Sequence, residues 1–240
     1  MYDALRGGAI AGAVGGGAYG LYVALVGNPL VAHAEELAHH GHEHGHGHGT
    51  TVVADGVTSV VSVGGSAALG LLFGLVVFGF VGYLLEPALP DRGGSFLLGL
   101  GGFLTVSGVP WLVLPPAAPG VETAMSTDFA LYLYAGLMAV GAVACIASGW
   151  VYHRLAEYGQ PVGTAAALVV FVTTVGIAAV VTPSPGYESG VPTTLEAAYI
   201  GTVVVGQIGL WGVTAAVHEG LAGFDSSGKW SHSPSESRIR

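Results

Sequence analysis

Charged side chains are the scarcest feature of this sequence. Only 9% of its 240 residues are Asp, Glu, Lys or Arg, whereas 52% are hydrophobic. A soluble domain carries about 25% charged residues, and long apolar stretches are typical of membrane spans. The composition therefore excludes an ordinary soluble domain and predicts an integral membrane protein.

Cations, thiols and nucleotide motifs are rarer still. Six Lys and Arg stand against fifteen Asp and Glu, and the net charge of −9 argues against nucleic acid as a partner. Cys145 is the single cysteine, so the chain has no internal disulfide and no CxxC motif. The sequence also lacks GxxxxGKS, GxxxxGKT and GxSxG, so we expect neither nucleotide binding by a P-loop nor an enzyme.

What the sequence has instead is a set of long apolar runs, each near the roughly 20 residues that a membrane helix needs. The six runs are Gly7–Val26, Val63–Leu85, Phe96–Leu114, Ala130–Tyr152, Gly163–Val181 and Ala197–Val217. Prolines, which stop helices, follow nearly every run. We expect an all-α integral membrane protein with a six-helix transmembrane domain at residues 1–222 and a polar tail at 223–240.

The few cations predict the orientation of these helices. All six lie on one side of an alternating bundle, at Arg6, Arg92, Arg154, Lys229, Arg238 and Arg240. Positive charge in short loops favours the cytoplasmic side. We therefore expect a multi-pass protein of the plasma membrane with both termini in the cytoplasm and the connection between the first two helices outside.

The first run has a second interpretation, as a cleaved signal peptide. Ala32-His33-Ala34 offers a small-x-small cleavage site after a charged start and an apolar stretch. The stretch is longer than a usual signal core, and Asn28-Pro29 interrupts it. We expect a retained helix, and mass spectrometry of the mature N-terminus distinguishes the two.

Glycine gives the first run its own pattern. Glycines recur every fourth residue at Gly8, Gly12, Gly16 and Gly20, and the second run repeats the spacing at Gly70 and Gly74. Small residues at this spacing share one helix face and allow another backbone to approach closely. We expect tight packing of this face within the chain or against another subunit, although glycine is common throughout this sequence.

The densest polar feature is a stretch at residues 33–49, here named the His/Glu segment. Its candidate metal ligands are His33, Glu35, Glu36, His39, His40, His42, Glu43, His44, His46 and His48. Neutral imidazole and carboxylate are ligands for divalent transition metals, and the interleaved glycines oppose a stable helix. The segment predicts an external site that captures metal; a solvated loop that binds metal incidentally is the alternative.

Acids elsewhere on the expected outer side strengthen this interpretation. With Asp55, Glu122, Asp128, Glu188 and Glu196, that side carries eight acids and no cation, a field that concentrates dications. The Irving–Williams order predicts that such ligands bind Ni²⁺, Cu²⁺ and Zn²⁺ at least as well as Co²⁺. The metal is expected as cargo, with no tightly bound cofactor.

Polar residues near the expected inner side are few. Glu86 ends the second run, Gln207 lies inside the sixth, and His218 and Glu219 end it. An ionisable group at membrane depth is a candidate functional residue. Glu86, His218 and Glu219 are candidate last ligands of an ion that leaves inward; ordinary interface residues are the alternative.

The segment after the third run resembles the signature region of the CbtA family of cobalt transporter subunits. The matching residues are Pro110, Trp111, Leu112, Pro115, Pro116, Pro119, Gly120, Tyr132 and Leu133. The Pro29-Leu30 exit of the first run is also similar, although Asn28 replaces the glutamate of the family. The resemblance implies a membrane component of cobalt uptake for cobalamin synthesis, often accompanied by CbtB, a small single-span subunit.

We therefore expect uptake of Co²⁺, or of Ni²⁺ or Zn²⁺, along a path that includes Glu86, Gln207, His218 and Glu219. The loop with Pro110, Trp111 and Glu122 is a candidate outer gate, and the packing faces allow a homo-oligomer. The alternatives are a membrane-anchored metal buffer or sensor, a nickel or zinc exporter, and a membrane enzyme with a bound metal pair.

Overall fold

The computed structural model describes residues 1–31, 52–117, 121–183, 186–189 and 192–228, so the His/Glu segment lies outside the described residues. The helical elements are α1 (Tyr2–Tyr22), η1 (Val23–Gly27), α3 (Val52–Gly74), η2 (Leu75–Val81), α4 (Gly82–Leu85), η3 (Glu86–Ala88), α5 (Gly94–Phe103), η4 (Leu104–Gly108), α6 (Val109–Trp111), α7 (Thr127–Leu155), η5 (Ala156–Tyr158), α8 (Gln160–Val181) and α9 (Thr193–Gly228).

Six continuous helices in the described part of the chain are long and apolar enough to cross a membrane. The prediction of a helical membrane protein with six spans is therefore confirmed. The first span is longer than its apolar run, because Tyr2–Val31 includes polar residues at both ends that remain helical. Backbone groups in a bilayer must bond within their own helix, which favours helices that continue to the interface.

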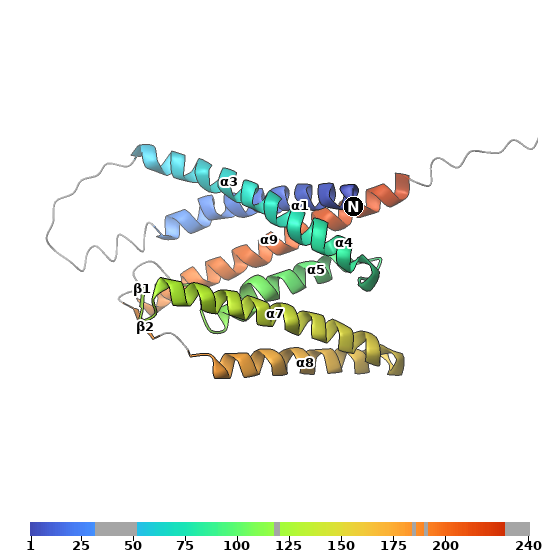
Figure 1. Ribbon diagram of the computed structural model, residues 1–240. Coiled ribbons are helices and arrows are strands. Elements are labelled where there is room, and N and C mark those ends of the chain that lie inside the picture. The colour runs from blue at the N-terminus through green and yellow to red at the C-terminus, as the bar shows by residue number, and fades with distance from the viewer. Residues whose placement is uncertain (32–51, 118–120, 184–185, 190–191, 229–240) are drawn as a thin grey trace, which may run out of the picture.

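Successive helices alternate in direction, so that α1 begins and α9 ends at the same end of the bundle (Figure 1). We name this the pocket end. Residues 31 and 52, which flank the undescribed connection between α1 and α3, lie at the opposite end, as do the first turns of α7 and α9. The chain positions of Arg6, Arg92 and Arg154 place these cations at the pocket end.

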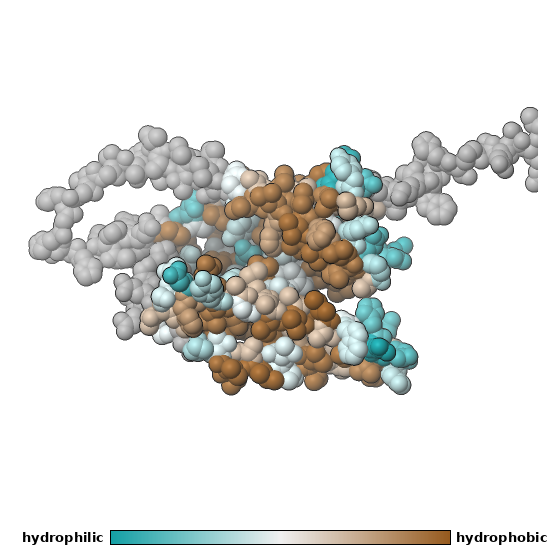
Figure 2. All heavy atoms as spheres, in the orientation of Figure 1, coloured by the Kyte–Doolittle hydropathy of each residue, from teal (hydrophilic) through white to brown (hydrophobic). Residues whose placement is uncertain are grey.

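The side chains are distributed as expected in a lipid environment. Apolar residues cover the long faces of the bundle, and hydrophilic residues gather toward its ends (Figure 2). On α8, Val180 and Val181 are 86% and 77% exposed. Exposure of such apolar side chains is unfavourable in water but favourable against lipid. The interior contains one cluster of Phe78, Leu98, Trp211 and Ala215. A second cluster joins α6, α7 and α8.

The glycine faces of α1 and α3 pack against each other within the chain. A Cβ added to Gly12 would lie 2.7 Å from Cα of Gly74, and one added to Gly70 would lie 2.7 Å from Cα of Gly16. Real Cβ atoms do not approach so closely, so only glycine permits this α1–α3 seam. The seam confirms tight packing of this face within the chain. The alternative that the face receives another subunit is wrong, because α3 covers it.

Three segments of the described helices, η1, η2 and η4, are π-helical. A π turn shifts the backbone ladder, and the displaced carbonyl needs another donor. In η4, the hydroxyl of Tyr134 on α7 donates to the carbonyl of Val106 at 2.7 Å. Such segments have the composition of ordinary membrane helix, which is why the sequence pattern did not reveal them.

A short antiparallel ribbon is the one departure from helix among the described elements. β1 (Val121–Thr123) pairs with β2 (Tyr187–Ser189), which ties the connection before α7 to the connection before α9. We name this side of the bundle the ribbon end (Figure 1). The register sets Glu122 directly opposite Glu188. The expectation of a purely helical chain omitted this ribbon.

Candidate functional site

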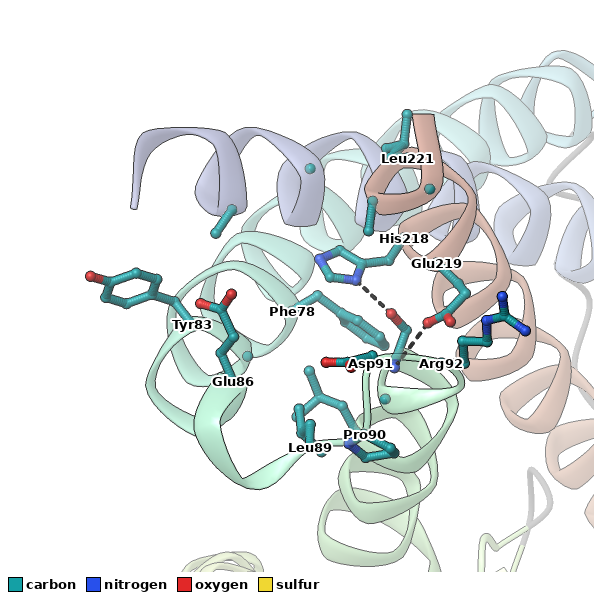
Figure 3. A pocket seen from close by; sticks show the side chains of 18 of the residues that line it. Phe78, Tyr83, Glu86, Leu89, Pro90, Asp91, Arg92, His218, Glu219 and Leu221 are labelled. Atoms are coloured by element: carbon teal, nitrogen blue, oxygen red, sulfur yellow. Dashed lines mark hydrogen bonds between the residues drawn. The ribbon is translucent and has the colours of Figure 1, made fainter. Parts of the chain in front are cut away.

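An open pocket of about 1070 Å³ lies at the pocket end. Its walls come from α1, from the stretch η2–α4–η3, from the turn before α5, and from α9 (Figure 3). We name it the α9 pocket. Its acidic, basic and histidine lining residues are Asp3, Glu86, Asp91, Arg92, His218 and Glu219. The structure thus brings Glu86, His218 and Glu219 to one pocket.

Glu219 is held by the first turn of α5. Its Oε1 accepts from the N–H of Gly93 at 2.6 Å, and its Oε2 accepts from the N–H of Ser95 at 3.2 Å. The first amides of a helix have no partner within it, and a carboxylate there also meets the positive end of the helix dipole. Gly93 has no side chain to cap the helix and adopts φ = 80°, so α9 supplies the cap. Glu219 therefore fastens α9 to α5.

His218 is held by the same turn. Its Nδ1 lies 2.9 Å from Oγ of Ser95, a residue that is only 7% exposed. The imidazole also packs on Phe78, with ring centroids 5.4 Å apart. Within the described residues no hydrogen bond is seen at Nε2, and this nitrogen points away from Ser95, toward the side of the pocket where Glu86 lies (Figure 3).

The other predicted path residues lie elsewhere. Gln207 is half-buried near the middle of α9. Pro110 is fully buried in α6, and Trp111 packs edge-on against Phe103 with centroids 6.2 Å apart. Glu122 lies in β1 at the ribbon end. The predicted residues therefore lie at both ends of the bundle, with Gln207 between them.

The sequence interpretation missed the residues that hold His218 and Glu219. Ser95 and Gly93 precede an apolar run, and Asp3 and Asp91 were counted only as charges. The sequence Asp91-Arg92-Gly93-Gly94-Ser95 is a turn followed by a helix start, a signal for an N-cap. It does not show which distant carboxylate completes that cap.

The α9 pocket is a vestibule and not a preformed coordination sphere. Across the part of the chain that the structure describes, no three of His, Cys, Asp and Glu come together closely enough to hold a metal ion. A closed transition-metal site needs about four ligands within roughly 2.3 Å of the ion. An ion in this pocket would keep water ligands or draw the carboxylates inward. The predicted ligands of the His/Glu segment lie outside the described residues.

A bundle of six membrane-length helices with an apolar perimeter and ionisable groups at its ends defines a polytopic membrane protein. The family model described as "Probable cobalt transporter subunit (CbtA)" matches residues 2–222. The chain belongs to this family of cobalt transporter subunits, which confirms the resemblance seen in the sequence. Comparison with curated proteins gives no match. Comparison with solved structures gives none either.

Proposed function

We propose that this chain imports Co²⁺, or a similar dication such as Ni²⁺ or Zn²⁺, through the plasma membrane for cobalamin synthesis. The observation that carries the proposal is the family match, which extends over almost the whole membrane domain. The word subunit in its description implies a partner, and we infer a small single-span protein of the CbtB type. A homo-oligomer of this chain is compatible with that assembly.

The distribution of charge supports an external ribbon end and a cytoplasmic pocket end. Arg154 lies in the last turn of α7 and Asp128 in its first turn, while Glu196 lies in the first turn of α9. Arginine near helix ends favours the cytoplasmic side. Acids at the external end attract dications, and Glu122 opposite Glu188 adds to that field.

The proposed route begins at the His/Glu segment, which raises the local dication concentration beside the ribbon end. It ends in the α9 pocket. The floor of this pocket includes Phe78 and Leu98, which belong to the apolar core cluster. A charge does not cross an apolar plug at acceptable cost, so the helices must rearrange during each passage. The membrane potential contributes about 2.3 kcal/mol per charge per 100 mV, hence roughly double for a dication.

Cells that produce the chain with its small partner should accumulate radioactive cobalt inside, because the family membership implies transport. The measurement is cell-associated cobalt that resists a chelator wash, with empty-vector cells as the control. Label that the wash removes entirely would indicate a buffer or sensor. Inverted vesicles that load cobalt would indicate an exporter. A metal pair that stays bound during dialysis, together with a catalytic activity that disappears when that metal is removed, would indicate an enzyme.

Replacing the seven histidines of the His/Glu segment by asparagine should lower uptake about tenfold at limiting cobalt. This factor is the lower end of the roughly 10- to 1000-fold increase in association rate that a raised local ion concentration gives. Uptake at saturating cobalt should be nearly normal. The same selective loss should appear in the native chain near pH 5, because imidazole with an ordinary pKa of about 6.5 is then protonated. Asparagine at His153 and His232 is the control. Unchanged uptake at limiting cobalt contradicts the capture role.

A further inference from the structure

We propose that His218 is the nitrogen ligand by which the α9 pocket prefers Co²⁺ and similar transition-metal ions over Mg²⁺, with Ser95 and Glu219 as its positioning residues. This inference rests on the proposed function and deepens it. It assigns different roles to His218 and Glu219, which are adjacent in α9 and which the sequence suggests equally as candidate ion ligands. Both side chains line the pocket, but both carboxylate oxygens of Glu219 accept amides of the turn before α5, whereas His218 contacts that turn through Nδ1 alone.

The hydrogen bond between His218 and Ser95 orients the imidazole. Nδ1 of His218 lies 2.9 Å from Oγ of Ser95, and the backbone N–H of Ser95 donates to the carboxylate of Glu219, so all three residues are held together at the first turn of α5. In the tautomer that carries its hydrogen on Nδ1, the hydroxyl oxygen of Ser95 accepts that hydrogen and Nε2 presents a lone pair to the pocket. Histidines that bind metals are oriented in this way, through a hydrogen bond from the other ring nitrogen.

Nε2 lies on the α1 side of the pocket. Gly7 of α1 and His218 both line the pocket, and a Cβ added to Gly7 would lie 3.9 Å from Nε2, an ordinary van der Waals distance. Glu86 lies on the side to which Nε2 points, whereas Arg92 lies on the opposite side, beyond Glu219 (Figure 3). Arg92, the cationic residue of the described pocket lining, therefore lies away from Nε2.

The chemistry of the lining explains the selectivity. The other acidic groups of the pocket, at Asp3, Glu86 and Asp91, are carboxylates on exposed residues. Carboxylate and water suit Mg²⁺ and Ca²⁺ as well as transition metals, whereas imidazole favours Co²⁺, Ni²⁺ and Zn²⁺. Among the residues that the structure describes, His218 is the one histidine that lines this pocket. Without it, the pocket would be an acidic vestibule with little preference among dications.

The test uses the full-length chain with its nine other histidines replaced by asparagine, so that any imidazole signal belongs to His218. X-ray absorption of bound Co²⁺ should show an imidazole ligand, and His218→Asn in this background should abolish it. The dissociation constant for Co²⁺ should rise on the order of 100-fold, and that for Mg²⁺ should stay within about twofold. Absence of the imidazole signal in a folded protein overturns the proposal.

The positioning role of Ser95 is tested separately. Ser95→Ala should keep the imidazole signal while weakening Co²⁺ binding about tenfold, and Ser95→Thr, which retains a hydroxyl, should restore it. If the proteins with Ser95, Ser95→Ala and Ser95→Thr bind Co²⁺ with equal affinity, the role of Ser95 is overturned. In the otherwise native chain, His218→Gln should lose discrimination of cobalt against magnesium in uptake, and His153→Gln, an exposed residue at the same end, should keep it. Retained discrimination by His218→Gln overturns the proposal.

Failure of this inference and failure of the proposed function give different results. A native chain that accumulates cobalt without an imidazole ligand supports import and refutes the role of His218. A native chain that shows the ligand but accumulates nothing supports the site and refutes import.

Discussion

Gly16→Ala should prevent α1 and α3 from packing and leave little folded protein in the membrane. A Cβ at this position would contact the carbonyl oxygen of Ser66 and lie 2.9 Å from Cα of Gly70. Both are backbone atoms of α3, so no side-chain rotation relieves the contact and the two helices must separate. Overpacking of a core costs about 1–3 kcal/mol. We expect the upper end of this range here, because small residues provide the close approach on which helix association in lipid depends.

The neighbouring residue provides the matched control. A Cβ added to Gly17 would lie 4.0 Å from Cβ of Ala67, an ordinary van der Waals distance. Alanine at this position also raises helix propensity by roughly 1 kcal/mol over glycine. The melting temperature of the purified protein, monitored by size-exclusion chromatography after heating, should be much lower for Gly16→Ala than for the native chain. It should not decrease for Gly17→Ala. Equal melting temperatures for the two variants would show that the α1–α3 seam is looser than the structure has it.

The second large effect is expected from Glu219→Ala. Removal of the carboxylate leaves the N–H groups of Gly93 and Ser95 without their acceptor. An unsatisfied buried donor costs about 1–3 kcal/mol, and because both groups are only partly buried we expect a total of about 2 kcal/mol. The first turn of α5 should then open more often. Hydrogen exchange of the amides of residues 93–98, together with the melting temperature, measures the change.

Two further variants separate the cap from general loss of charge in the α9 pocket. Glu86→Ala removes an exposed acid from the same pocket, and it should leave the exchange of α5 unchanged. Glu219→Gln keeps one carbonyl oxygen that can accept, so its effect should lie between those of native protein and alanine. If Glu86→Ala and Glu219→Ala open α5 equally, the protection comes from pocket charge and not from the cap.

Much of this architecture follows from local patterns. The lengths of the apolar runs predicted six spans, because a bilayer admits only backbone that is satisfied within its own helix. The four-residue glycine spacing of α1 predicted close helix packing, because that spacing keeps small residues on one face. Arg6 precedes the first apolar run, and Arg92 and Arg154 follow the second and fourth; this alternation predicted that the three cations share one end.

Other features depend on residues that are distant in the sequence. The glycine face of α1 could serve a second chain or this one, and only the docking of α3 decided between them. His218 and Glu219 looked equivalent as ligands at the end of α9. Their difference arises 124 residues away, where the turn at Gly93–Ser95 presents amides that need a carboxylate and a hydroxyl that needs a partner. A hydrogen bond requires both groups in one place, and only the folded bundle brings α5 and α9 together.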